Sequence, residues 1–281
     1  MKTDRSCSEI RLSAEHLTRP PLRYHDRMGR ALITGASSGL GRDFAHLFSE
    51  DGDDVVLIAR REARLVQLAR DLETRYGNCV TVIGADLRAV DAAERIVGAV
   101  SGVKIDYLVN NAGFGIVGDF ATTDLSAEIG MIQLHVIATT KLTKLLLPSM
   151  LERGHGRILN VASIAAFLPG PYAAVYYATK AYLLSWSEAV SEELRGTPVT
   201  LTTLCPGRTS TEFASLASVP DAALLARPVS SMAVAREGYL AMRRGQRLVV
   251  PGLANKAITY FVRLAPRSLV TTVTRIIQQR G

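Results

Sequence analysis

The feature that most constrains this chain is a repeated alternation between short apolar runs and longer helical patterns. The apolar runs predict strands at residues 31–34, 55–59, 79–85, 105–110, 157–163, 199–205 and 247–251. The intervening patterns predict helices at 40–50, 62–76, 89–100, 125–152, 174–195 and 230–243. Strands that read as continuous apolar runs are buried on both faces, and repeated strand–helix units form parallel sheets with right-handed crossovers. The sequence therefore predicts an α/β fold, a single doubly wound domain whose central parallel sheet of about seven strands is flanked by helices.

The composition divides the chain into three parts. Residues 1–27 mix charges throughout and lack the apolar stretch of a secretory signal, so we expect a disordered N-terminal arm. Residues 28–251 contain the strand–helix repeats. Residues 252–281 predict a basic C-terminal extension of two short amphipathic helices, separated near Pro266.

The net charge of +7 is concentrated near the C-terminus. From Arg227 onward the chain contains ten Lys and Arg residues and one acidic residue, Glu237. A basic, apolar segment is compatible with a membrane surface, an anionic substrate or a solvated face, and these alternatives stay open. No nucleic-acid-binding module and no basic patch with interleaved aromatic groups is visible, so no nucleic-acid partner is expected.

The cysteine pattern bears on location and on metal binding. Cys7, Cys79 and Cys205 are far apart and odd in number, which matches no disulfide framework and no metal-ligand spacing. No metal is expected, and the pattern is typical of a reducing compartment. The longest apolar runs are too short to span a bilayer. We therefore expect a cytoplasmic protein, with membrane association through the C-terminal segment as the alternative.

A glycine-rich turn, "TGASSGLG" at residues 34–41, follows the first predicted strand and leads into a helix. Gly35, Gly39 and Gly41 provide a tight bend, close backbone approach to a pyrophosphate, and helix–strand packing. Phosphates at such a turn meet free N–H groups at the helix N-terminus. The alternative is an ordinary glycine-rich loop, but the strand–turn–helix context is the one that dinucleotide binding requires. The predicted phosphate site comprises Gly35, Ser37, Ser38, Gly39, Leu40 and Gly41.

The end of the second strand predicts which dinucleotide binds. An acidic residue there would bind the adenosine ribose, whereas an arginine accommodates a 2′-phosphate. Arg60 and Arg61 follow Ala59 directly, and no acidic residue stands at the strand end. A surface arginine pair is the alternative, although positive charge is slightly unfavourable where a helix begins. We therefore predict NADP (NADPH) rather than NAD as the cofactor.

The stretch "YAAVYYATKAYLLSW", residues 172–186, contains four tyrosines and one lysine. On a helix, residues four apart share a face, and only Tyr176 lies four residues before Lys180. A neighbouring ammonium favours the phenolate and lowers the pKa of a tyrosine. By itself this spacing is also compatible with aromatic packing.

Taken together, these motifs resemble the short-chain dehydrogenase/reductase (SDR) family. "TGASSGLG", "NNAG" (residues 110–113), Ser163, "YYATK" (residues 176–180) and "PG" (residues 206–207) occur in that family's order and spacing. The resemblance covers about residues 29–251 and implies a Rossmann fold. The region through "GQRLVVPG" also resembles the bacterial DltE-like branch.

The resemblance implies roles for individual residues. Ser163 would orient a substrate oxygen, Tyr176 would exchange a proton with that oxygen during hydride transfer, and Lys180 would lower the pKa of Tyr176 and hold the ribose hydroxyls. Besides Tyr176 and Lys180, and beyond the phosphate turn and the arginine pair, the resemblance implies further cofactor-binding residues. Asp86 and Leu87 would border the adenine, with Asp86 bonding its amino group, and Asn110, Ala112 and Gly113 would line the adenosine side and stabilise the central sheet. Pro206 and Gly207 would face the nicotinamide, and Thr211, with Thr209 and Ser210 as alternatives, would contact that end.

The chain departs from the family at His135, which occupies the place of a helical Asn that holds a water in a proton relay. Histidine donates and accepts hydrogen bonds and titrates near neutral pH. Two hypotheses follow. Either His135 preserves the relay with an altered pH dependence, or it is a packed helix residue and the relay is weakened or rerouted.

The residues near these motifs predict the substrate class. Phe114, Ile116, Phe167, Leu168, Pro169 and Tyr172 are the expected pocket residues. They are mostly apolar, so we expect an apolar ketone, aldehyde or secondary alcohol, with residues 211–228 as a mobile lid. The resemblance also implies a homo-oligomer, a dimer or a tetramer. The competing interpretations are a non-catalytic dinucleotide-binding sensor or assembly protein, and a membrane-peripheral reductase of lipid or acyl carbonyls.

Overall fold

A computed structural model describes residues 29–210 and 229–279 of the chain. Its centre is a seven-stranded sheet in the order β3-β2-β1-β4-β5-β6-β9, in which every pairing is parallel. The strands are β1 (Arg30–Thr34), β2 (Asp54–Ala59), β3 (Val80–Gly84), β4 (Tyr107–Asn110), β5 (Gly156–Val161), β6 (Val199–Leu204) and β9 (Leu248–Val249). The predicted doubly wound α/β fold is confirmed, and each predicted strand is present to within three residues at either end.

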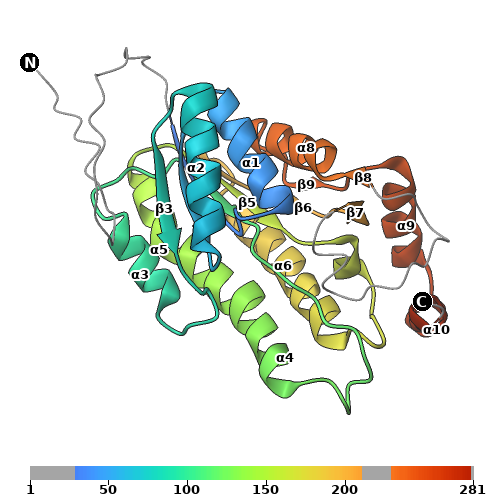
Figure 1. The fold of residues 1–281 in the computed structure, drawn as a ribbon. Coiled ribbons are helices and arrows are strands. Elements are labelled where there is room, and N and C mark those ends of the chain that lie inside the picture. The colour runs from blue at the N-terminus through green and yellow to red at the C-terminus, as the bar shows by residue number, and fades with distance from the viewer. Residues whose placement is uncertain (1–28, 211–228, 280–281) are drawn as a thin grey trace, which may run out of the picture.

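Helices cover both faces of the sheet (Figure 1). One face packs against α1 (Gly39–Glu50), α2 (Glu62–Tyr76) and α8 (Ser231–Arg243). The other packs against α3 (Ala92–Ala99), α5 (Thr139–Glu152) and α6 (Ala174–Glu193). Burial on both faces is the reason why the strands read as continuous apolar runs. A small second sheet pairs β7 (Thr209–Ser210) with β8 (Val229–Ser230).

The helix predicted at 125–152 is not uniform. It begins as α4 (Leu125–Ile132), passes through a π-helical turn, η1 (Gln133–Ala138), and continues as α5. Such turns are rare and concentrate at functional sites. His135 lies in this turn, and a 3₁₀ turn, η2 (Ile164–Phe167), follows β5 directly after Ser163.

The C-terminal segment forms the two predicted helices, α9 (Leu253–Leu264) and α10 (Arg267–Gln279), on either side of Pro266. They are not detached from the domain. The Nε2 of Gln278 donates a hydrogen bond to the Tyr177 hydroxyl at 3.0 Å, which ties α10 to the start of α6. In Figure 1, α9 and α10 lie at the far side of the molecule from α3.

Three expectations remain untested by the fold. The N-terminal arm and the lid at 211–228 lie outside the described residues. The domain limits stay a prediction. Within the described ranges, no helix is long and apolar enough to cross a bilayer.

Candidate active site

A cavity of about 990 Å³ opens at the carboxyl ends of the central strands. β1 and β4 lie side by side at the centre of the sheet, where the strand order reverses, and doubly wound folds bind ligands at such a point. The segments that follow six strands all contribute to the lining. These are Gly35 after β1, Arg60 after β2, Ala85 after β3, Asn111 after β4, Ser163 after β5 and Pro206 after β6.

The glycine-rich turn has the backbone that the sequence predicts. Gly35 and Gly39 have φ of +69° and +52°, in the region that disfavours side chains. Gly41 does not line the cavity but packs against the turn, since an added Cβ would meet the Asn111 Nδ2 at 2.6 Å and the Gly35 carbonyl still closer. Ser38 caps α1 without a side-chain hydrogen bond, so N–H groups of the first helical turn remain available to an anion. The residues present therefore fit a dinucleotide pyrophosphate.

Arg61 is the arginine that contacts this turn. Its guanidinium donates hydrogen bonds to the Ser38 hydroxyl at 2.7 Å and to the Ser37 hydroxyl at 3.0 Å. Arg60 and Arg61 both line the cavity. The pair therefore lies beside the phosphate turn, as a 2′-phosphate site requires, with Arg61 rather than Arg60 bonded to the turn.

Asp86 and Leu87 lie at the predicted adenosine side of the cavity. Arg88, which the sequence analysis did not single out, lines the same wall and forms an ion pair with Asp86 at 2.6 Å. The hydrogen bonds from Arg88 hold the pKa of the Asp86 carboxyl below its usual value. The carboxylate is thus charged and held in place, and its bond to an adenine amino group remains a prediction.

Asn110 does not line the cavity, contrary to its expected place on the adenosine side, but it does stabilise the central sheet, which is the other role that the resemblance implies. It is buried, and its amide donates to Asn160 at 2.8 Å and to Thr143 at 3.1 Å. It therefore links β4 to β5 and α5. Alternate strand residues point to opposite faces, so the next residue, Asn111, faces the turn and donates to the Thr34 carbonyl at 2.9 Å. The motif "NNAG" contains two adjacent Asn residues, and Asn111 lines the cavity in place of the predicted Asn110. Ala112 and Gly113 line the cavity as predicted.

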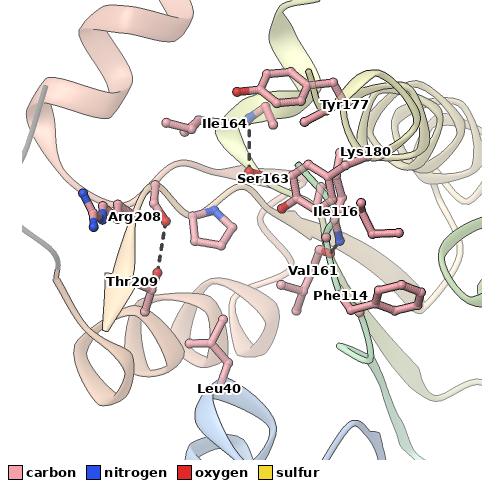
Figure 2. A pocket seen from close by; sticks show the side chains of 18 of the residues that line it. Leu40, Phe114, Ile116, Val161, Ser163, Ile164, Tyr177, Lys180, Arg208 and Thr209 are labelled. Carbon is pink, nitrogen blue, oxygen red and sulfur yellow. Dashed lines mark hydrogen bonds between the residues drawn. The ribbon is translucent and has the colours of Figure 1, made fainter. Parts of the chain in front are cut away.

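Ser163, Tyr176 and Lys180 meet at one point of the cavity lining. In Figure 2, Ser163 and Lys180 lie between Arg208 and Thr209 on one side and Phe114 and Ile116 on the other. The Ser163 hydroxyl accepts a hydrogen bond from the Ala165 N–H at 3.1 Å, which fixes its orientation at the start of η2. A second hydrogen bond joins the Ser163 and Tyr176 side chains.

Burial raises the pKa of Tyr176 to about 12, and the hydrogen bond with Ser163 lowers it only in part. The direction is opposite to the expectation that Lys180 depresses this pKa. The reason is geometric, because the Lys180 Nζ donates to the Val161 carbonyl at 3.0 Å and lies 5.8 Å from the centroid of the Tyr176 ring. Burial also lowers the pKa of Lys180 itself to about 8. At neutral pH, Tyr176 therefore retains its proton and can donate it.

His135 is buried, and its hydrogen bonds bear on the two hypotheses for it. Thr179 donates its hydroxyl proton to the Tyr176 carbonyl at 2.8 Å, so it must accept from the His135 Nδ1–H at 2.9 Å. The Nε2 accepts from the Phe114 N–H at 3.2 Å. Both ring nitrogens are used by the neutral tautomer, and burial followed by the Lys180 charge holds the pKa of His135 well below its usual value. The geometry favours the packed residue over a titrating relay.

The nicotinamide end of the predicted site is partly described. Pro206, Gly207 and Thr209 line the cavity, and the Thr209 hydroxyl donates to the Gly207 carbonyl at 3.0 Å. Thr211 lies outside the described residues. Arg208 lines this end as well.

The substrate side of the cavity differs from the prediction. Phe114, Ile116 and Leu168 line it, whereas Phe167, Pro169 and Tyr172 do not. Tyr177 lines the cavity although it is turned away from Tyr176 on α6, because α10 closes over that side of the helix. One wall of the cavity comes from the C-terminal segment, which the sequence analysis did not place at the substrate site. Its residues are Asn255, Ile258, Phe261, Val262, Ala265, Leu269, Val270, Val273, Thr274, Ile277 and Gln278. The apolar spacing of 269, 270, 273 and 277 was the available signal, but it does not reveal what the face packs against.

The sheet, the turn and the cavity at the strand reversal define an α/β protein of the dinucleotide-binding class. The sequence profile of the short chain dehydrogenase family matches residues 30–219. The chain belongs to this family.

Relatives and solved structures agree with this assignment. A ketoacyl reductase, HetN, from Nostoc is 38% identical over 186 residues, which cover 64% of this chain and 63% of the relative. A very-long-chain 3-oxoacyl-CoA reductase from Neurospora crassa is 35% identical over 66% of this chain and 58% of the relative. The matches to these curated relatives thus span less than two thirds of their length.

Two solved structures show family members with bound cofactor. A short-chain dehydrogenase from Sphingobium yanoikuyae in complex with NADPH is 28% identical, with a TM-score of 0.76 over 84% of this chain and 94% of that one. A Burkholderia phymatum family member in complex with NAD is 25% identical, with a TM-score of 0.74 over 86% of this chain and 94% of that one. A nicotinamide dinucleotide is therefore the supported cofactor, and the choice between the two forms rests on this chain's own residues.

Proposed function

We propose that this chain is an NADP(H)-dependent oxidoreductase that interconverts an apolar ketone or aldehyde and its alcohol, with Tyr176 as the acid/base. The observation that carries the proposal is the Tyr176 phenol, hydrogen-bonded to Ser163 in the lining of a cavity that also contains Arg61 beside the phosphate turn. One cavity thus joins a proton donor to a dinucleotide site. NADP is favoured over NAD because Arg60 and Arg61 stand where a 2′-phosphate would lie.

In the proposed reaction, Ser163, Tyr176 and the cofactor have separate roles. When bound, the reduced nicotinamide supplies a hydride to the carbonyl carbon. The Ser163 hydroxyl is held by the Ala165 N–H and is hydrogen-bonded to Tyr176, and it would turn its proton to a substrate oxygen that bound between the two side chains. Tyr176 donates its proton to that oxygen as charge develops on it. Because burial raises the pKa of Tyr176 to about 12, the protonated form dominates at neutral pH, and this is the form that the reductive step requires.

The substrate that this cavity favours is a long-chain 3-oxoacyl compound. The apolar wall from α9 and α10 extends the cavity beyond the space near Ser163. Two relatives carry names that specify ketoacyl or 3-oxoacyl-CoA reduction. An acyl chain along the C-terminal helices would place the 3-oxo group near Tyr176.

The test is turnover of 3-oxoacyl thioesters of increasing chain length with NADPH. We expect kcat/KM to rise with chain length and Tyr176→Phe to lower kcat about 10²–10⁴-fold while NADPH binding is retained. The control is Tyr182→Phe, which removes a hydroxyl from the same helix where Tyr182 is 38% exposed and outside the cavity lining. If NADPH binds but no carbonyl is turned over, the non-catalytic dinucleotide-binding interpretation replaces this proposal.

The homo-oligomer, the cytoplasmic location and the DltE-like branch remain predictions. Sedimentation of the purified chain tests the first of them directly.

A further inference from the structure

The outer face of α9 carries an apolar stripe that the described residues, 29–210 and 229–279, leave exposed. It comprises Leu253, Tyr260, Phe261 and Leu264, which are 84%, 67%, 68% and 71% exposed. Positions spaced by 7, 8 and 11 residues share one face of a helix. The opposite face is the packed one, because Asn255 and Thr259 are buried there. Large apolar side chains collected on one exposed face usually mark an interaction site.

The charged side chains of α9 and α10 are all of one sign. Lys256 and Arg263 lie on α9, and Arg267 and Arg275 lie on α10. Among residues 252–279 of the described chain, no acidic residue is present. The Arg263 guanidinium lies 5.7 Å from the centroid of the Phe167 ring, which anchors that cation beside the stripe. The two C-terminal helices therefore combine exposed apolar side chains with exclusively cationic charged ones.

The α9 stripe is continuous with the cavity. Phe261 belongs to the stripe and also lines the cavity. Leu269 and Val273 of α10 line the cavity while they are 55% and 46% exposed. These three side chains thus connect the exposed surface of α9 and α10 with the cavity lining.

We propose that the α9 stripe docks on an anionic lipid bilayer and that apolar substrates enter the cavity from that surface. A helix with an apolar face and a cationic border lies in the interface of a bilayer rather than across it. Each Lys or Arg near an anionic surface adds to the attraction. A second copy of this chain fits less well, since a symmetric contact would place the same cations against one another. Docking does not depend on the proposed activity, whereas substrate entry does.

The experiment is flotation of the whole protein with vesicles of phosphatidylcholine containing 30 mol% phosphatidylglycerol. We expect binding to these vesicles and weak binding to pure phosphatidylcholine. Leu264→Glu should lower binding at least about 10-fold, and replacing both Lys256 and Arg267 with Gln should lower it about 30-fold, at about fivefold per cation. The matched controls are Leu125→Glu on α4, where Leu125 is 72% exposed, and Lys144→Gln on the exposed side of α5.

The outcomes separate the alternatives. Absence of flotation at low salt, or equal losses for Leu264→Glu and Leu125→Glu, would overturn the proposal. Sedimentation without lipid gives the second readout, because a dimer that Leu264→Glu dissociates would assign the stripe to a second copy of the chain. Flotation is measured without turnover, so its failure is distinct from failure of the proposed reaction. Entry of substrate from the bilayer is tested separately. The original chain should have a higher kcat/KM for a substrate embedded in vesicles, and Leu264→Glu should abolish this increase. The same variant should still reduce a short water-soluble ketone normally.

Discussion

The replacement of Arg61 by alanine tests the cofactor assignment most directly. Arg61 Nη2 donates to the hydroxyls of Ser37 and Ser38 at 3.0 and 2.7 Å, which places the guanidinium at the edge of the phosphate turn. A 2′-phosphate at this edge would receive charge-assisted hydrogen bonds from it. Hydrogen bonds to charged groups contribute about 1.5–3 kcal/mol each, and about 1.4 kcal/mol corresponds to a factor of ten in affinity.

The expected loss has two parts that differ between cofactors. Loss of the contact with the two serines loosens the turn and weakens NADPH and NADH alike, by about 1 kcal/mol, since these hydroxyls remain accessible to water. Loss of the phosphate contact affects NADPH alone. We therefore expect Arg61→Ala to raise the Kd for NADPH about 60- to 700-fold and the Kd for NADH about fivefold.

Isothermal titration calorimetry with each cofactor measures both constants. Arg70→Ala is the charge-matched control, because it removes an exposed cation of α2. Arg70 lies about 13 Å from Arg61 along the helix axis, which is beyond the Debye length at physiological salt. Equal losses for NADPH and NADH in Arg61→Ala would refute the 2′-phosphate contact. A larger selective loss in Arg60→Ala would place the phosphate on the neighbouring arginine instead.

Three further predictions follow from buried groups in and around the site. Burial lowers the pKa of Lys180 from 10.5 to about 8, so between these values the unfolded chain binds more protons and the free energy of unfolding rises with pH. The Lys180→Met variant should therefore have a free energy of unfolding about 3 kcal/mol higher than that of the original chain at pH 7, apart from packing changes. Urea unfolding should show that this difference is about 1 kcal/mol smaller at pH 9. His135→Asn should leave the pH–rate profile between pH 5 and 9 unchanged, because the neutral imidazole does not titrate there, and a displaced acid limb would revive the relay hypothesis. Gly41→Ala should destabilise the fold by about 1–3 kcal/mol in the same unfolding assay, because its Cβ would overlap the phosphate turn. Gly98→Ala on α3, where an added Cβ meets nothing within 4 Å, should instead be neutral or stabilising.

Most of the site residues that were predicted from motifs lie in the lining of the cavity. Gly35 and Gly39 of the turn, the arginine pair and the group of Ser163, Tyr176 and Lys180 all line one cavity, as the motifs and the family resemblance implied. Each of these predictions concerned residues whose chemistry is read from their local sequence context. Asn110 was misassigned because a shift of one residue along a strand reverses the face to which a side chain points.

The sequence alone determined the architecture, because an apolar run buried on both faces and a helix beginning at a glycine turn are local patterns whose period is visible in the chain. The identity of the candidate catalytic tyrosine was implied by the family resemblance, with which its spacing of four residues from Lys180 agrees. Only the tertiary structure decided which groups surround them. It turned the Lys180 ammonium to the Val161 carbonyl, engaged both nitrogens of His135, and closed the cavity with α9 and α10. Burial and electrostatics depend on neighbours that are distant in sequence, so the pKa values of Tyr176 and Lys180 and the shape of the substrate wall follow from packing that no local pattern specifies.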